Sequence, residues 1–416
     1  MAAAMFGVGW GANQFASLLI AYHQHQGLSV GTDQALFGIY ALGLVPALLV
    51  GGPASDRYGR GALMRPAAIL SVVATGVLIG GVGFTPFLYL GRFLAGMASG
   101  VALAVGSVWV KELSVPPYDP VVGEQGGARR AAIALSAGFG LGPVVAGLLA
   151  QWSPDPLVVA YLPHLAVMAL VAPGLWWVTE TAPPASRNLP NAWSRLRVPL
   201  ARHPRFVSVV VPLAPWVFGA PAVAFAVLPT VVAGHTTGYG VAFAGAVAGV
   251  TLGVGVAVQP LARRLDRADS VRGGVVGMAA IVLGMALAAL AAARTSPVLV
   301  LVAAVVLGAG YGLCLVSGLL EVQRLATPGA LASLTAVYYA LTYVGFALPV
   351  VLSELTVFAG YPALLGGLAV LAAGCLVIMA VRSPARPADL QWREGARGAG
   401  PRGSTGATGK GCRKGE

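Results

Sequence analysis

Charged residues are scarce in this chain. Lys, Arg, Asp and Glu make up 10% of its 416 residues, whereas 57% are hydrophobic. An average soluble domain has about 25% charged residues, which help to cover its water-facing surface. The composition therefore excludes an ordinary water-soluble domain and indicates a membrane protein.

Cysteines and cofactor motifs are also few. The three cysteines do not indicate a disulfide framework, because Cys314 and Cys375 lie in apolar segments and Cys412 lies in the tail. His23 and His25 lack an evident third metal ligand. No P-loop or nucleophile elbow is present, and a glycine pattern near the N-terminus follows no strand. We therefore expect no metal, no cofactor and no catalytic residues, and we do not expect an enzyme.

Long apolar segments fill most of the chain. A helix needs about 20 mostly apolar residues to cross a bilayer, because lipid offers no hydrogen-bond partner to its backbone. The sequence has twelve such segments, at residues 4–22, 34–52, 66–84, 87–110, 131–151, 157–178, 206–233, 241–261, 273–293, 297–320, 331–358 and 361–381. We predict an all-α membrane protein with twelve transmembrane helices.

Basic residues lie in alternate connections between these segments. Of 26 Lys and Arg residues, only Arg92 and Arg294 fall elsewhere. Because cytoplasmic loops collect basic residues, both termini are expected in the cytoplasm. The net charge of +12 could indicate a nucleic-acid-binding protein, but this placement of the basic residues argues against that function. The first segment has no basic residues before it and is long enough to span, so we expect no cleavable signal peptide. The abundance of Arg, Ala and Gly favours a bacterial inner membrane.

A polar, proline-containing stretch divides the chain. It predicts an N-terminal six-helix bundle at residues 1–182, a cytoplasmic central loop at 183–205 and a C-terminal six-helix bundle at 206–382. Residues 383–416 are rich in Gly and Arg and predict a disordered basic cytoplasmic tail. Residues 260–267 align loosely with residues 53–60, which suggests that the two bundles are pseudo-symmetric.

The ten residues GGPASDRYGR, at positions 51–60, form a charged connection between the second and third segments. A glycine there allows close helix approach, and a carboxylate accepts hydrogen bonds from a helix N-terminus. Thr327-Pro328 has the pattern of such a terminus, at the start of the eleventh helix. The spacing resembles the signature between helices 2 and 3 of the major facilitator superfamily (MFS). The resemblance implies the MFS fold and a role as a conformational latch for Gly52, Asp56, Arg57, Gly59 and Arg60.

The fourth segment contains Arg92 followed by Gly96 and Gly100, which is similar to a second motif of this superfamily. The resemblance implies proton handling or substrate contact for Arg92; the alternative is a side chain that extends to the lipid headgroups. Asn13 and Gln14 in the first segment either join helices or line the substrate path.

Related antiporters often carry a carboxylate in helix 1, 4 or 7, and this chain has none there. The remaining candidates for carrying a proton are Asp33, His23, His25, Glu321 and Glu354, and for each of them a solvated residue at a span end is the alternative.

The fifth segment resembles a motif of antiporter branches of the superfamily, with Ala146 in place of one glycine. Its residues are Gly138, Gly142, Pro143 and Gly147. Pro143 removes a helix hydrogen bond, and the small residues allow close packing. Gly245, Gly249 and Gly253 repeat at the same spacing in the eighth segment, so we predict that helices 5 and 8 touch.

Several aromatic residues in the seventh, tenth and eleventh segments are candidates to line a cavity, with lipid-facing or interhelical packing as the alternative. They are Trp216, Phe218, Phe225, Tyr311, Tyr338, Tyr339 and Tyr343. Together these features predict a secondary transporter whose partners are the lipid bilayer, a small-molecule substrate and protons. Proton-coupled efflux of small amphipathic compounds is the leading hypothesis. A sugar or other polar-metabolite importer is the alternative, and a non-transporting membrane sensor is a remote one.

Overall fold

The computed structural model describes residues 1–119, 123–182, 199–266, 271–326 and 331–382. All regular structure in these ranges is helical. Eleven helices are long and apolar enough to cross a membrane. The first predicted span consists of two shorter helices, α1 (Ala2–Asn13) and α2 (Phe15–Gln26), which meet at Gln14. With this pair, the twelve predicted segments are all helical.

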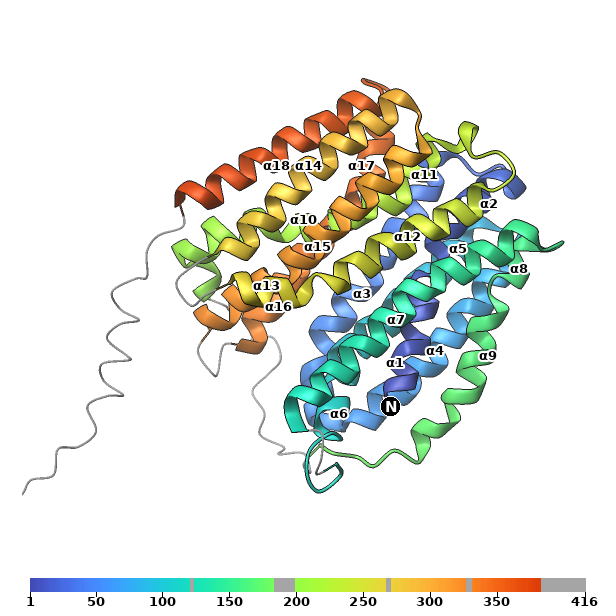
Figure 1. Cartoon of the computed structure of the whole chain (residues 1–416). Helices are drawn as coiled ribbons and strands as arrows, with labels where there is room; N and C mark the ends of the chain where they lie inside the picture. The colour runs from blue at the N-terminus through green and yellow to red at the C-terminus, as the bar shows by residue number, and fades with distance from the viewer. Residues whose placement is uncertain (120–122, 183–198, 267–270, 327–330, 383–416) are drawn as a thin grey trace, which may run out of the picture.

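The helices form two neighbouring groups (Figure 1). The N-terminal half contains α1, α2, α3 (Val30–Tyr58), α4 (Arg60–Gly80), α5 (Thr85–Val101), α6 (Ser107–Glu112), α7 (Gly123–Trp152), α8 (Pro156–Val159) and α9 (Leu162–Val171). The C-terminal half contains α10 (Val211–Ala222), α11 (Leu228–Val231), α12 (Gly240–Ala257), α13 (Gln259–Leu265), α14 (Arg272–Arg294), α15 (Pro297–Leu325), α16 (Leu331–Val344), α17 (Leu348–Leu355) and α18 (Tyr361–Arg382). The predicted central loop and tail lie largely or wholly outside the described residues, so the proposed domain boundaries stay predictions.

The stretch 51–60, expected as a loop, is mostly helical. Helix α3 continues to Tyr58 and α4 begins at Arg60, so only Gly59 separates them. Gly59 has φ +100°, a conformation that side chains other than glycine rarely adopt. The prediction of a loop was wrong because the hydropathy of a sequence locates only the part of a helix that lies in the lipid. The helix itself can continue beyond the bilayer into water.

Several predicted spans contain breaks, as the first does at Gln14 and the fourth does at a π-helical segment, Ala102–Gly106. In the seventh, α10 is flanked by π-helical segments, Phe206–Val210 and Val223–Val227. Proline has no N–H to donate to the preceding turn, and the wider hydrogen-bond pattern accommodates this loss. The eleventh span has a 3₁₀ turn at Gly345–Ala347, between α16 and α17, and the sixth is divided between α8 and α9.

Glycines bring helix backbones together at equivalent places in the two halves. In the N-terminal half, a Cβ added at Gly96 would collide with the carbonyl oxygen of Tyr40, so α5 and α3 are in backbone contact. In the C-terminal half, Gly308 and Gly312 of α15 contact the backbone of α12 in the same way. These are helices 4 and 2, and helices 10 and 8, which agrees with two pseudo-symmetric bundles.

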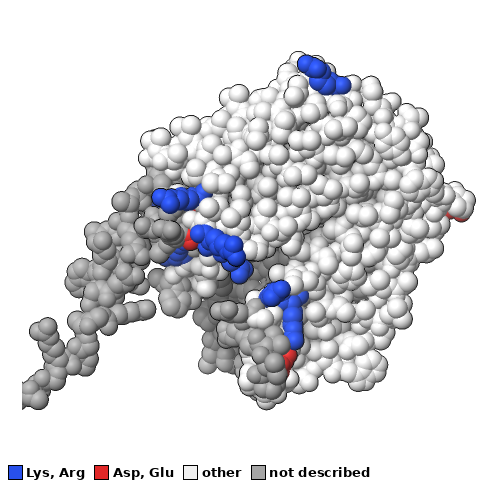
Figure 2. Space-filling view, in the orientation of Figure 1, with Lys and Arg blue, Asp and Glu red and all other residues white. Residues whose placement is uncertain are grey.

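Charge is concentrated at one end of the molecule. Figure 2 shows a broad uncharged surface, with most visible Lys and Arg atoms near one end. We call the end that carries Arg60, Lys111 and Arg263 the basic end. The end that carries Gly27 and Gly238 is the opposite end. An uncharged band between them is suited to lipid contact.

Candidate functional site

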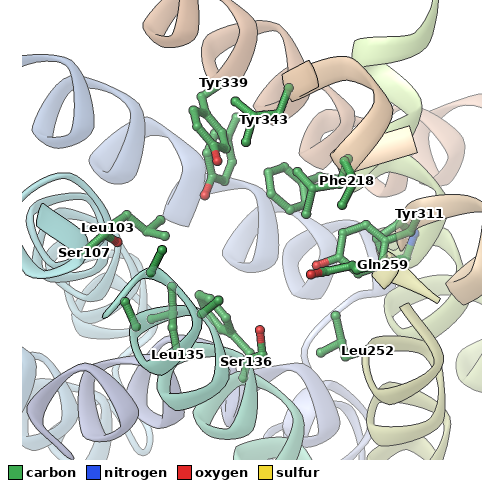
Figure 3. Close-up of a pocket in the computed structure, with 18 of the residues that line it drawn as sticks. Leu103, Ser107, Leu135, Ser136, Phe218, Leu252, Gln259, Tyr311, Tyr339 and Tyr343 are labelled. Atoms are coloured by element: carbon green, nitrogen blue, oxygen red, sulfur yellow. The ribbon is translucent and has the colours of Figure 1, made fainter. Parts of the chain in front are cut away.

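A cavity of about 840 Å³ lies between the two halves (Figure 3). Helices α1, α3, α6 and α7 contribute one wall, and α10, α12, α13, α15 and α16 contribute the other. Lys111, Arg263 and Gln323 line it at the basic end, where their side chains are exposed. At the other extreme it is lined by buried rings, so the cavity opens at the basic end. Its size suits a drug-sized molecule.

Aromatic side chains dominate the cavity wall. The lining rings are Tyr40, Phe139, Phe218, Phe225, Tyr311, Tyr339, Tyr343 and Phe346. Several of them stack: the ring centroids of Phe218 and Tyr343 are 4.6 Å apart, and those of Tyr343 and Phe346 are 5.6 Å apart. Five of the seven aromatic residues named from the sequence line this cavity: Phe218, Phe225, Tyr311, Tyr339 and Tyr343.

Two predicted cavity residues face elsewhere. Trp216 is buried within the C-terminal half and does not line the cavity. Tyr338 is fully buried and its hydroxyl donates to the carbonyl oxygen of Leu315, 3.0 Å away. Tyr40, Phe139 and Phe346 line the cavity although sequence reasoning missed them. Phe346 lies in the 3₁₀ turn of the eleventh span.

Rings from both halves close the cavity toward the opposite end. Phe37 of α3 stacks on Phe346 at a centroid distance of 5.1 Å and meets Phe225 edge-on at 5.7 Å. Nearby, Gln34 Nε2 donates to the carbonyl oxygen of Ala226, 2.8 Å away, in a buried hydrogen bond. The rings and the Gln34 bond therefore join the two halves at this level.

Gln151 makes a second connection between the halves at the opposite end. This residue of α7 lies beside the first turn of α12. Its Oε1 accepts from the backbone N–H groups of Val241 and Ala242 at 2.9 and 3.2 Å, and its Nε2 donates to the Gly238 carbonyl at 3.0 Å. Gln151 thus satisfies helix-terminal N–H groups that have no partner within α12.

Helices α7 and α12, the fifth and eighth spans, touch as the glycine spacing predicts. A Cβ added at Gly245 would lie 2.6 Å from the Pro143 carbonyl oxygen, and one at Gly147 would lie 2.8 Å from the Val241 carbonyl oxygen. Gly249 also faces α7, through the side chain of Val144.

The other glycines named in the fifth and eighth segments do not face this contact. A Cβ on Gly142 would lie 2.8 Å from the carbonyl oxygen of Trp10 in α1, and Gly138 faces the same helix. Gly253 has nothing within 4 Å. The four-residue spacing does not follow one helix face closely enough to keep every glycine at a single neighbour.

Arg92 is buried inside the N-terminal half, with 2% of its surface exposed. It donates to the carbonyl oxygens of Ala12 and Leu36 at 3.0 and 3.2 Å. Its guanidinium carbon lies 4.6 Å from the ring centroid of Phe15 and 4.8 Å from that of Tyr40. The alternative in which this side chain extends to the headgroups is therefore wrong. Tyr40 stands between Arg92 and the cavity.

The two amides of the first span have different environments. Asn13 lines the cavity and donates to the carbonyl oxygen of Phe139 at 3.0 Å. Gln14 is buried, and its Nε2 lies 3.3 Å from Thr75 Oγ1. Thr75 Oγ1 also lies 2.9 Å from Nδ1 of His164, a buried residue that sequence reasoning missed. Asn13 thus belongs to the cavity, whereas Gln14 joins helices.

Asp33 lies outside the cavity, near the opposite end. It is 3% exposed, and its Oδ2 is 3.7 Å from Nδ1 of His23. Its Oδ1 has no hydrogen-bond partner among the described residues. Glu321, another proton candidate, is instead paired with Arg205 at 2.7 Å.

Comparison with known proteins identifies the family. A family model described as the Major Facilitator Superfamily matches residues 1–349. The chain belongs to this superfamily. No curated protein sequence matches the chain.

Solved transporter structures share the fold of this superfamily member at low sequence identity. The nucleoside transporter NupG is 13% identical, with a TM-score of 0.68 over 92% of this chain and 98% of its own. A POT family transporter in complex with 5-aminolevulinic acid is 16% identical, with a TM-score of 0.72 over 92% and 95%. The xylose transporter XylE from E. coli, in a partially occluded inward open conformation, is 16% identical, with a TM-score of 0.65 over 92% and 97%. These similarities establish the fold.

The superfamily signature at 51–60 forms an ion-pair cluster at the basic end. Arg60 Nη1 donates to Asp56 Oδ1 at 2.6 Å, and Arg60 Nη2 donates to Glu112 Oε1 at 2.9 Å. The hydroxyl of Thr181 also donates to Glu112. The cluster therefore ties α3, α4 and α6 together within the N-terminal half.

Glu180 completes this cluster and was missed from the sequence. Its carboxylate accepts from the backbone N–H groups of Arg60 and Gly61, both at 2.9 Å, at the start of α4. Partial burial raises the pKa of the Glu180 carboxyl, but these bonds and those from Thr181 and Ala182 outweigh it and lower the pKa below its ordinary value. An acidic residue directly after the sixth span was the available signal.

One expectation for the signature, at Gly52, needs correction, and another stays a prediction. A Cβ added at Gly52 would have nothing within 4 Å, so no helix approaches there in this conformation. The expected partner of Asp56 at positions 327–328 lies outside the described residues. Arg57 is exposed and its guanidinium carbon lies 5.4 Å from the ring centroid of Tyr58. The latch role therefore stays a prediction.

Proposed function

We propose that this superfamily member is a secondary transporter that moves a small solute by alternating access, and that it works by proton-coupled efflux of small amphipathic compounds. The observation that carries the proposal is the cavity between the halves, open at the basic end and closed at the opposite end by contacts between them. Rocking of one half against the other would exchange which end is open.

The charge distribution supports an orientation. Cytoplasmic ends of membrane proteins collect Lys and Arg, so the basic end faces the cytoplasm in this proposal. The structure then corresponds to an inward-open state with both termini in the cytoplasm, and the composition favours a bacterial inner membrane.

The cavity wall favours amphipathic solutes over sugars. Its described lining has eight aromatic rings, four of which carry a tyrosine hydroxyl, against two serines, two basic residues and three amides, Asn13, Gln259 and Gln323. A polar metabolite would need more amide and charged partners to replace its lost hydration. The alternative, an importer of a polar metabolite, draws support from the nucleoside and xylose transporters that share the fold. A non-transporting sensor is disfavoured by the presence of a cavity of this size.

Asp33 is the residue that we propose to carry the proton. Its buried carboxylate has an oxygen without a described partner, and His23 is its nearest basic neighbour. It lies near the end that is closed here, so it would meet the exterior only after the halves rock. Binding a proton there would favour one conformation over the other.

The test combines ligand screening with flux. Purified protein would be screened against a compound library by thermal shift, and the stabilising compounds would be followed in proteoliposomes that contain pyranine. We expect amphipathic compounds to stabilise the protein and their flux to change the internal pH. Asp33→Asn should retain binding but lose the pH change. Stabilisation by sugars alone would favour the importer, and flux without any pH response would rule out proton coupling.

A further inference from the structure

The charge of the cavity points to a narrower class of substrate. No Asp or Glu is among the described residues that line the cavity, whereas Arg263 lines its mouth. A second positive charge, Arg92, lies behind the Tyr40 ring and bonds to backbone carbonyls. Apolar walls focus the field of such charges into a cleft. An organic cation would therefore enter against a positive potential.

Aromatic walls often attract cations through their ring faces, but here many faces are already covered. Phe346 lies between Phe37 and Tyr343, with interplanar angles of 24° to each. Tyr343 in turn packs against Phe218, and the Tyr40 face is occupied by Arg92. Ring edges, which carry the positive part of the quadrupole, are therefore more available than faces.

Hydroxyl groups add hydrogen-bond donors to this environment. Tyr311, Tyr339, Tyr343, Ser107 and Ser136 line the cavity, and their hydroxyls have no hydrogen-bond partner in the described part of the chain. Figure 3 shows that these side chains come from both halves. Hydroxyl groups donate strongly to an ionised carboxylate.

We propose that the cavity selects amphipathic organic anions, an aromatic body carrying a carboxylate, over organic cations of the same size, and that Arg263 contributes to this selection. The proposal rests on the proposed transport function, because it names the charge class of the transported solute. The rings would contact the apolar body, and the hydroxyls and the positive field would stabilise the carboxylate.

Three matched probes test this selection: 1-naphthylacetate, 1-naphthylacetamide and 1-naphthylmethylammonium. Binding to the purified full chain would be measured by calorimetry at pH 7. We expect the anion to bind about tenfold more tightly than the cation, with the amide between them, and the difference to shrink at high salt. Equal or tighter binding of the cation, or no binding of the anion, would overturn the proposal.

Arg263→Gln provides the residue-level test, with Arg264→Gln as its control. Both side chains are exposed on α13, but only Arg263 lines the cavity. We expect Arg263→Gln to weaken anion binding about threefold and to leave the cation unchanged or tighter. The Arg264 variant should bind all three probes as the unaltered protein does. Equal effects of the two variants would contradict the role of Arg263.

Uptake of the same probes into proteoliposomes separates the two proposals. If the anion binds preferentially but no probe crosses the membrane, transport fails while charge selection stands. If all three probes cross at equal rates with equal affinities, transport stands and charge selection fails.

Discussion

Glu180 illustrates how much a single side chain organises at the basic end. Its carboxylate closes the N-terminus of α4, where the helix dipole and unsatisfied N–H groups favour negative charge. Because the folded pKa is lowered, its contribution to stability is complete above the ordinary carboxyl value of 4.5 and is lost as the pH falls through the folded value.

We therefore predict that Glu180→Gln lowers the Tm by about 2 °C at pH 7, because the charge at the helix terminus is lost. The difference should shrink as the pH falls below 4.5 and disappear once the pH is below the lowered pKa of the folded state, where the native carboxyl is also protonated. Thermal unfolding in detergent over a pH series measures this. Asp155→Asn, at an exposed position whose side chain caps no helix, is the control. A constant difference at every pH would contradict the cap.

The residue types predicted the chemistry of the site better than they predicted which residues belong to it. The aromatic content of the seventh, tenth and eleventh spans indicated a ring-lined cavity, and the cavity between the halves is lined by five of the seven residues named, Phe218, Phe225, Tyr311, Tyr339 and Tyr343. Tyr338, next to Tyr339, points about 100° away around the helix. Because the segment is apolar on all sides, its sequence does not reveal which face meets the cavity.

At the scale of helices, the contact between α7 and α12 joins the two halves. A Cβ atom added to Gly245 would lie only 2.6 Å from the carbonyl oxygen of Pro143. We predict that Gly245→Ala destabilises the protein by about 1–3 kcal/mol and reduces transport, because a backbone must move to admit the methyl group. Tm and flux measurements check this.

Gly253→Ala, eight residues later on α12, is the matched control because nothing lies within 4 Å of its added Cβ. It should leave Tm and flux near the values of the unaltered protein. If the two variants behave alike, the contact between α7 and α12 does not have the importance assigned to it.

The sequence predicted the helices themselves well, because each crossing must satisfy its own backbone in lipid. It predicted their ends and breaks less well. Helix α3 extends to Tyr58, past its apolar segment, and the first span is interrupted at Gln14 without any proline. Such features depend on tertiary contacts, including the Gln14 bond to Thr75, which no local pattern reveals.

At the scale of the whole molecule, the two halves meet at one end and separate at the other. Gln151, Gln34 and the ring of Phe37 make contacts between the halves near the opposite end. The twelve spans were predictable from composition, but the open end was not. Two conformations of a transporter differ by only a few kcal/mol, too little for hydropathy and charge counts to resolve.

Alternating access requires the two halves to exchange between two arrangements. The decisive measurement is the distance between spin labels at Arg129→Cys on α7 and Arg264→Cys on α13, both exposed positions at the basic end. We predict two distance populations in lipid, with the shorter one increasing when the pH or a bound solute favours closure of the basic end. A single distance that no solute or pH changes would contradict alternating access.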